Sequence, residues 1–173
     1  APTTAEGAVV SLAGKLDSLA GCFAAGMIPT GSADPYALRR QALGMIRIVL
    51  EKQLPLDLDE AIARAIALQP VSVPESAKLA AQLSDFVWGR AQSLFEDMHY
   101  AVDEVRSVRS GALKNFPNAF LRLAALRAVR RDPAFDSLAA AFKRASNILK
   151  QAKTGDGAPV ERATLREQAD FDL

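Results

Sequence analysis

Apolar residues recur at steps of three and four along most of this chain, and that spacing limits the possible folds more than any other feature. From about residue 5 to residue 25, the recurring residues are Val9, Leu12, Leu16, Leu19 and Phe23. This is the period of one face of an α-helix. No stretch alternates apolar and polar residues as a half-buried strand does, and β-branched residues are sparse. We therefore predict an all-α fold, a helical bundle of about six to seven helices.

Turn-forming residues mark where the first two helices end and begin. Gly26 stands where a helix-terminating glycine belongs. Asp34 followed by Pro35 is the pattern of an N-cap and a first-turn proline, so we expect the second helix to begin there. Pro55 follows its end. The expected inward residues of this helix are Leu38, Ala42, Met45, Ile46 and Val49.

The later part of the chain repeats this organisation. Asp57 or Asp59 is expected to cap a short helix, and the longest periodic segment runs from Pro74 to about Tyr100. Its expected inward residues are Leu79, Leu83, Phe86, Val87, Leu94 and Met98. Those of the last strong helix are Leu138, Phe142, Ala145 and Leu149.

The composition fits one folded domain of ordinary charge. Half of the 173 residues are apolar, and 21 basic residues nearly balance 20 acidic ones, which leaves a formal charge of +1. A dedicated nucleic-acid binder would carry a larger positive excess, so any such contact must come from a local patch. We assign residues 1–153 to one helical region and residues 154–173 to a polar tail.

Single residues and missing patterns exclude several kinds of site. The one cysteine, Cys22, lies among apolar residues and is interpreted as a structural thiol. The one histidine, His99, cannot form a His-rich metal site. No apolar run reaches the about 20 residues of a membrane-spanning helix, and no signal-peptide pattern is present. We expect a cytoplasmic protein without a membrane partner, and we interpret the start at Ala1 as that of a trimmed piece of a longer chain.

The least ordinary segment is GMIPTGSADPYALRRQALGMIRI, residues 26–48. Its PTGS sequence superficially resembles a phosphate-binding loop. The Walker pattern, however, requires a preceding strand and a following lysine, and both are missing here. Proline, glycine and Asp-Pro are the residues that a tight connection between two helices requires. The segment is therefore predicted to be a connector.

The helix after this loop carries three arginines. At about 100° per residue, Arg40 and Arg47 fall on nearly one line, with Gly44 between them and Arg39 one step round the helix. Guanidinium groups beside such a notch suit phosphates or the carboxylates of a partner. The alternative to such a partner-facing surface is a charged face exposed to solvent, with Glu51 pairing nearby within the same chain, and the sequence favours neither.

A second polar stripe lies on the last strong helix. Lys143, Asn147 and Lys150 share one side, with Arg144 beside them. The ordinary interpretation is the solvated face of an amphipathic helix. No acidic residue stands at ligand or triad spacing from a histidine, so we predict no catalytic set and no metal site. Trp88 and Tyr100 are interpreted as lone aromatics of a core or interface.

Three segments resemble the beta subunit of bacterial glycyl-tRNA synthetase. The first is KLDSLAGCFAAGMIPTGSADPYALRRQALGMIRIVLE, in which PTGS, DPYALRR and ALGMIRI match rare words of the family's signature. The others are GRAQSLFEDMHYAVDEVRSV and LAAAFKRASNILKQA. The resemblance runs from about Leu12 to Lys153.

This resemblance implies part of an α2β2 class II synthetase that joins glycine to tRNA-Gly with ATP. In that family the alpha subunit holds the aminoacylation site and uses ATP and Mg²⁺, while the beta subunit mainly binds tRNA and supports assembly. The chain would cover the end of an HD-like domain and the helical region after it. It would stop before the anticodon-binding domain, hold no cofactor, and be inactive alone.

One position departs from the family pattern and bears on the alternatives. The family's ADK reads AGK here, so Gly14 replaces an aspartate. An aspartate on a late helix helps HD phosphohydrolases to bind metal, so a remnant hydrolase is the least favoured hypothesis. The favoured one is tRNA contact through Arg39, Arg40 and Arg47 and through the stripe at Lys143. The other is a purely structural scaffold whose arginines pair with carboxylates of the synthetase.

Overall fold

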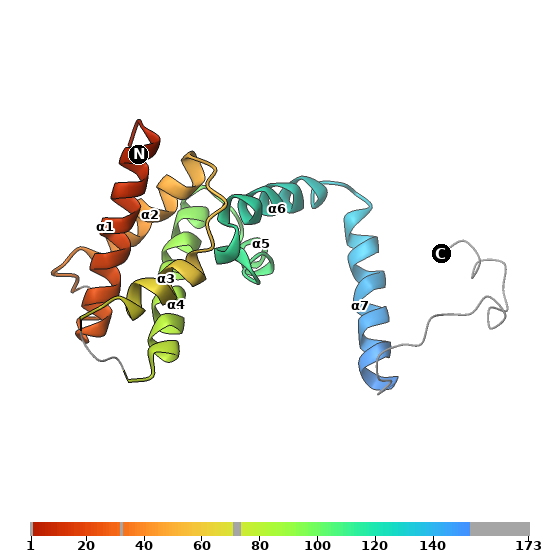
Figure 1. The fold of residues 1–173 in the computed structure, drawn as a ribbon. Coiled ribbons are helices and arrows are strands. Elements are labelled where there is room, and N and C mark those ends of the chain that lie inside the picture. The colour runs from red at the N-terminus through yellow and green to blue at the C-terminus, as the bar shows by residue number, and fades with distance from the viewer. Residues whose placement is uncertain (1, 32, 71–73, 153–173) are drawn as a thin grey trace, which may run out of the picture. The chain divides into compact units, whose positions relative to one another are not determined.

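The computed structural model describes residues 2–31, 33–70 and 74–152, and within them every regular element is a helix (Figure 1). The described helices are α1 (Ala5–Ala24), α2 (Leu38–Glu51), α3 (Leu58–Ala67), α4 (Ser76–Asp97), α5 (Val102–Ser107), the 3-10 helix η1 (Ala112–Lys114), α6 (Phe116–Val129) and α7 (Phe135–Ala152). No strand occurs among these residues. The prediction of an all-α fold with six to seven helices is confirmed.

The chain divides into two compact units, residues 1–129 and residues 130–173. In the first unit α1 packs on α2 and α3, and α4 packs on the same two helices; α6 packs on α2 and α5. The second unit contains α7. The predicted boundary between residues 153 and 154 lies at the edge of the described residues and stays a prediction, as does the HD-like assignment.

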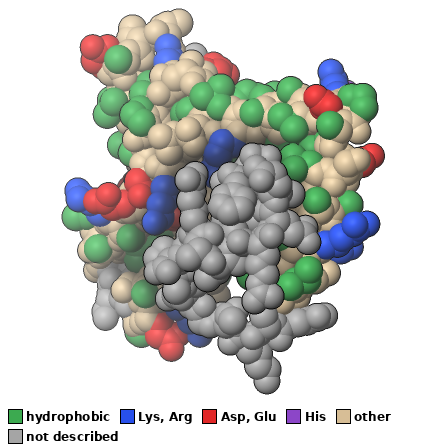
Figure 2. Space-filling view, turned by 90° about the vertical axis from the view of Figure 1, so that its right-hand side faces the viewer, with side chains coloured by type: hydrophobic (Ala, Val, Ile, Leu, Met, Phe, Trp, Pro, Cys, Tyr) green, Lys and Arg blue, Asp and Glu red, His purple; other side chains and the backbone are tan. Residues whose placement is uncertain are grey.

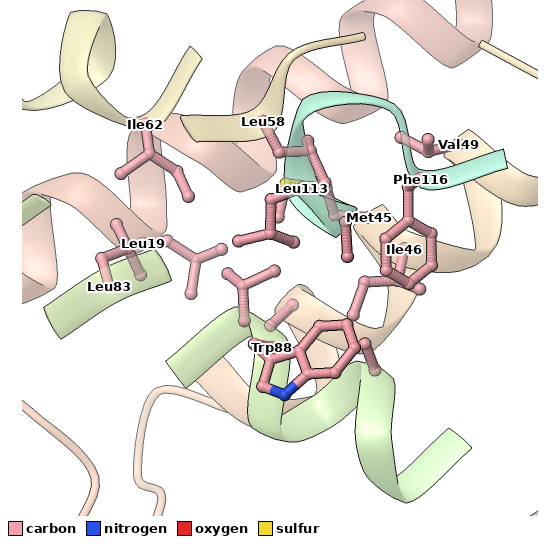
Figure 3. Close-up of a cluster of buried hydrophobic side chains, with 14 of the residues drawn as sticks. Leu19, Met45, Ile46, Val49, Leu58, Ile62, Leu83, Trp88, Leu113 and Phe116 are labelled. Carbon is pink, nitrogen blue, oxygen red and sulfur yellow. The ribbon is translucent and has the colours of Figure 1, made fainter. Parts of the chain in front are cut away.

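The core of the first unit is made of large aliphatic and aromatic side chains from several helices. Figure 3 shows Leu19 of α1, Met45 and Ile46 of α2, and Leu83 and Trp88 of α4 in one cluster. Each of these five residues is buried. Trp88 is therefore a core residue, which is one of the two roles, core or interface, that the sequence left open.

The inward face of α1 is rotated slightly from the prediction. Leu12, Leu19 and Phe23 are buried as expected, whereas Val9 is 63% exposed and Ala8 is buried instead. The expectation for Val9 is wrong because apolar spacing marks a broad stripe, and neighbouring helices cover one side of it.

The length and composition of α1 would also suffice to cross a membrane, with a mean hydropathy of 1.2. An uninterrupted apolar run is absent because Lys15 and Asp17 divide it, but the alanine, valine, leucine and phenylalanine residues around them keep the mean hydropathy at 1.2. Leu19, Ala20 and Phe23 of this helix lie in the protein core. Core helices pass the same test, so the finding is weak evidence for a membrane span.

α7 differs most from the prediction for its side chains. Leu138, Phe142 and Leu149, which were expected to face inward, are between 66% and 73% exposed. α7 is the only helix among the described residues of its unit. No second described element of that unit is available to cover its apolar face.

The end of α1 follows the pattern that Gly26 predicted. Gly26 has a left-handed backbone with φ of 75°. Its N–H donates to the Phe23 carbonyl at 3.0 Å, and the Met27 N–H donates to the Cys22 carbonyl at 2.8 Å. These two bonds form a Schellman motif, which satisfies carbonyls that the helix end leaves free.

The start of α2 differs from the prediction. The helix begins at Leu38 rather than beside Pro35, and Ala37, with φ of 54°, occupies the N-cap position. Asp34 still caps the helix, because its carboxylate accepts the N–H groups of Leu38 at 2.8 Å and Arg39 at 3.0 Å. The capping residue was identified correctly, but its distance from the helix was not.

An aromatic cluster joins α4 to α6. The Phe95 ring is stacked on Phe116 with ring centroids 5.6 Å apart and on Phe120 at 5.7 Å. Tyr100 meets Phe95 edge to face, and the Arg127 guanidinium lies 4.4 Å from the centroid of the Tyr100 ring. Tyr100 is therefore not the lone aromatic that the sequence suggested.

Candidate binding face on helix α2

The loop between α1 and α2 is fastened by Arg39. The Arg39 guanidinium donates to the Gly31 carbonyl at 2.6 Å and to the Ala33 carbonyl at 3.2 Å. Because the Arg39 guanidinium donates to its own loop, it has fewer free N–H groups for a partner molecule than Arg40 and Arg47 have. The three arginines predicted to share one face therefore have two roles: Arg39 holds the loop, and Arg40 and Arg47 remain exposed.

The amino end of α2 is also occupied by the protein itself. Free N–H groups and the helix dipole make such an end a potential anion site. Here the carboxylate of Asp34 accepts two of these N–H groups. A phosphate would have to displace Asp34 from both, so the interpretation of this segment as a connector fits the geometry better than a phosphate cradle.

Arg40 and Arg47 form the accessible part of the face. Both side chains are exposed, and they are seven residues apart on the same helix. Seven residues bring the helix back to within about 20° of the same line. Among the described residues, neither guanidinium has a hydrogen-bond or ion-pair partner. The two cations are therefore available to a partner.

The predicted notch at Gly44 is filled by a residue from another helix. A Cβ on Gly44 would lie 3.0 Å from Cε and 3.8 Å from Cδ of Lys15, which belongs to α1. The Lys15 ammonium donates to the Ser11 hydroxyl at 2.8 Å. We name the resulting cluster of Lys15, Arg40 and Arg47 the basic face.

Sequence reasoning missed Lys15 as a member of this face. Lys15 is separated from Gly44 by nearly thirty residues, so no helical spacing relates them. The only signal was the glycine itself, since a missing side chain in a helix interior often marks the close approach of a neighbour. The basic face therefore combines a helical line on α2 with one cation from α1.

The stripe on α7 lies in the second unit and is described by itself. Lys143, Arg144, Asn147 and Lys150 are all exposed. Lys143, Asn147 and Lys150 share one side by helical spacing. On the surface shown in Figure 2, lysine and arginine side chains are scattered among acidic and apolar ones without a single broad basic field.

The acidic residues serve local structure. Of the two capping candidates, Asp57 caps α3 by accepting the Glu60 N–H at 3.0 Å. Asp59 accepts the Ser84 hydroxyl at 2.8 Å, and Asp85 forms an ion pair with Arg109 beside it. Asp59, Ser84, Asp85 and Arg109 line a polar pocket of about 170 Å³, and their polar groups pair within it through this hydrogen bond and this ion pair.

Two further predictions concerned the cysteine and metal binding. Cys22 is partly buried and packs against the core, which agrees with a structural thiol. Across the ranges that the structure describes, no group of three or more His, Cys, Asp or Glu side chains is placed to hold a metal ion. Nothing packs near Gly14, where the family pattern has an aspartate: a Cβ there would meet no atom within 4 Å.

Comparison with known proteins supplies the context for this face. A family model described as the glycyl-tRNA synthetase beta subunit matches residues 1–110. A glycine–tRNA ligase beta subunit of Pseudomonas aeruginosa (strain LESB58) is 47% identical over 98% of this chain and 25% of its own length. That of Geobacter metallireducens is 42% identical over 98% of this chain and 24% of its own length. The chain thus spans about a quarter of the length of the curated relatives it matches.

Proposed function

The chain belongs to the glycyl-tRNA synthetase beta-subunit family, and from this premise we propose that it is a non-catalytic, tRNA-contacting region of a glycine–tRNA ligase. The complete enzyme would be a cytoplasmic α2β2 class II synthetase that joins glycine to tRNA-Gly with ATP. The alpha subunit would bind ATP and Mg²⁺ and carry out the reaction. This region would contribute binding energy and subunit organisation.

The observation that supports tRNA contact is the basic face. Arg40 and Arg47 are exposed and fall on nearly one line of α2, and the Lys15 side chain lies across Gly44 of the same helix. Neither guanidinium has a hydrogen-bond or ion-pair partner among the described residues. Arginine binds phosphate oxygens through two parallel N–H groups, which also fixes orientation. Phosphate contacts of this kind position a nucleic acid without reading its sequence.

The experiment is a binding measurement on the intact synthetase. Arg40 and Arg47 are both changed to alanine, and the dissociation constant for tRNA-Gly is measured over a series of salt concentrations. If both arginines meet phosphates, affinity should fall and the salt slope should decrease by about two, since each phosphate contact contributes close to one. Unchanged affinity with an unchanged slope would reject the RNA role of this face.

Arg64→Ala is the matched control. Arg64 is an exposed arginine on α3 that forms an ion pair with Glu60 at 2.6 Å. Its removal changes the net charge of the protein by the same amount per residue. A similar loss of affinity in this control would assign the effect to overall charge and not to the basic face.

The stripe on α7 is a second candidate contact for the same tRNA. Lys143, Arg144 and Lys150 supply three exposed cations, and Asn147 can donate or accept a hydrogen bond. Double replacement of Lys143 and Lys150 by alanine tests it in the same binding assay. Loss of affinity with a smaller salt slope would support the contact, whereas unchanged binding would remove the stripe from the proposal.

The alternative function is that of a scaffold without tRNA contact. The engagement of Arg39 with its own loop favours it, because that arginine serves the fold. Under this alternative, Arg40 and Arg47 would pair with carboxylates elsewhere in the synthetase. The double variant would then reduce assembly or thermal stability of the complex, while intact complexes would keep their tRNA affinity.

A further inference from the structure

An apolar groove lies on the surface of the first unit, and no charged side chain lines it. Val9, Leu12, Ala13 and Leu16 of α1 form one wall, and the loop residues 54–56 form the other. The groove has a volume of about 420 Å³. The wall residues of α1 recur at steps of three and four, so they form a continuous strip along the helix.

α1 leaves much of its apolar surface uncovered. In its most apolar stretch of 18 residues, only 28% of the residues are buried. Val9 and Val10 are 63% and 72% exposed. Soluble proteins rarely leave a contiguous apolar patch open unless it is an interaction surface. The groove therefore needs an occupant in the complete protein.

The length of the relatives indicates which occupant this is. The chain corresponds to 24–25% of the aligned beta subunits, so about three-quarters of such a polypeptide lies outside residues 1–173. A segment tethered to the same chain has a far higher effective concentration than a separate molecule. A lining without charged residues is also typical of permanent contacts, since transient interfaces are more polar.

A lipid bilayer fits this groove less well. Lys15 and Asp17 lie in the middle of α1, where a membrane-spanning helix would carry an uncompensated cost. Asp17 accepts a hydrogen bond from the Gln69 amide at 3.3 Å, and Lys15 lies across Gly44. Both charged side chains thus contact other parts of the protein, and the groove strip is an apolar side of α1 that these contacts do not cover.

We infer that the groove between α1 and residues 54–56 is the seat of an apolar segment from the remainder of the same beta-subunit polypeptide. The inference rests on membership of the family and on the length of its members. It does not depend on tRNA contact, so either proposal can fail without the other.

The first test measures whether the groove is covered in the full-length beta subunit bound to its alpha subunit. Ala13→Cys places a thiol on the groove wall, and Gly14→Cys places one on the next residue of α1, which faces open space. Maleimide labelling of each position is followed by peptide mass spectrometry, which separates both from native Cys22. We expect labelling at position 13 to be slower than at position 14 by about tenfold or more, because reactivity follows exposure.

Conditions during labelling distinguish the occupants. Labelling rates of the two cysteines in denaturant, where both are fully exposed, are expected to be equal and provide the reference. Equal rates in the folded complex would overturn the inference. If labelling at position 13 is slow but becomes fast on dilution, the occupant is a second copy of the subunit. If labelling at position 13 is slow only when phosphatidylglycerol vesicles are added, the occupant is a membrane. Either result would also overturn the inference.

The second test identifies the occupant directly. A photoreactive benzoylphenylalanine replaces Val9 in the full-length subunit, and the illuminated complex is analysed by intact mass and peptide mapping. We expect a cross-link within one beta subunit, to a peptide outside residues 1–173. A product with the combined mass of two subunits would contradict the inference, as would cross-linking confined to solvent or lipid.

Discussion

The side chain of Lys15 on α1 lies across Gly44 on α2, so that a Cβ on Gly44 would come within 3.0 Å of the Lys15 Cε. This contact brings the aliphatic part of a lysine side chain on α1 to the glycine that stands between Arg40 and Arg47 along α2, while the Lys15 ammonium donates to the Ser11 hydroxyl. The glycine thus supports both the packing of the two helices and the composition of the basic face.

Gly44→Ala should stabilise the chain by about 0.5–1 kcal/mol, because alanine is favoured over glycine in a helix interior. The new methyl group meets the far part of a lysine side chain, which can move by a few tenths of an ångström at little cost. Urea unfolding measures the effect. Gly14→Ala is the control, since nothing lies within 4 Å of its Cβ; a loss of stability at Gly44 alone would mean that Lys15 cannot move.

Lys15→Ala should weaken binding of tRNA-Gly to the intact synthetase and lower the salt slope by about one, if the basic face meets phosphate as proposed. Lys78→Ala is a matched control, because Lys78 is exposed on α4 and forms an ion pair with Glu75 at 2.9 Å. Filter binding at several salt concentrations measures both variants. An equal effect of the two replacements would refute a specific role for Lys15.

Arg39→Ala should destabilise the chain by about 1 kcal/mol or somewhat more, since two hydrogen bonds to the loop carbonyls of Gly31 and Ala33 are lost. Arg40→Ala should change stability by less than about 0.5 kcal/mol, because its side chain is exposed. Urea unfolding of both variants compares neighbouring arginines in one helix. Equal destabilisation would show that Arg40 also supports the fold.

Asp34→Ala should cost about 1–2 kcal/mol, because the N–H groups of Leu38 and Arg39 lose their acceptor at the start of α2. Asp34→Asn should cost less, since an amide oxygen can still accept a hydrogen bond. Thermal unfolding followed by circular dichroism measures the order of the three proteins. An alanine variant as stable as the parent would show that water replaces the carboxylate without loss.

Several features of this protein were readable from the sequence because they depend on residues within one or two helical turns. Apolar spacing predicted an all-α chain. Gly26 predicted the end of α1, and the pair Asp57 and Asp59 narrowed the cap of α3 to two residues, because a terminal glycine and a capping carboxylate act on backbone groups a few residues away. The signature segment around PTGS identified the family, which the comparisons confirm.

The tertiary structure decided which of several suitable residues face a partner. Val9 fits the apolar stripe of α1 but is exposed, because the neighbouring helices cover only part of that stripe. Arg39 and Arg40 are adjacent and chemically identical, yet only Arg39 can reach the loop carbonyls from its side of α2. Lys15 joins the basic face because α1 and α2 pack with Gly44 between them. Helical period determines the direction of each side chain around its own axis, and only the packing of the helices determines what lies in that direction.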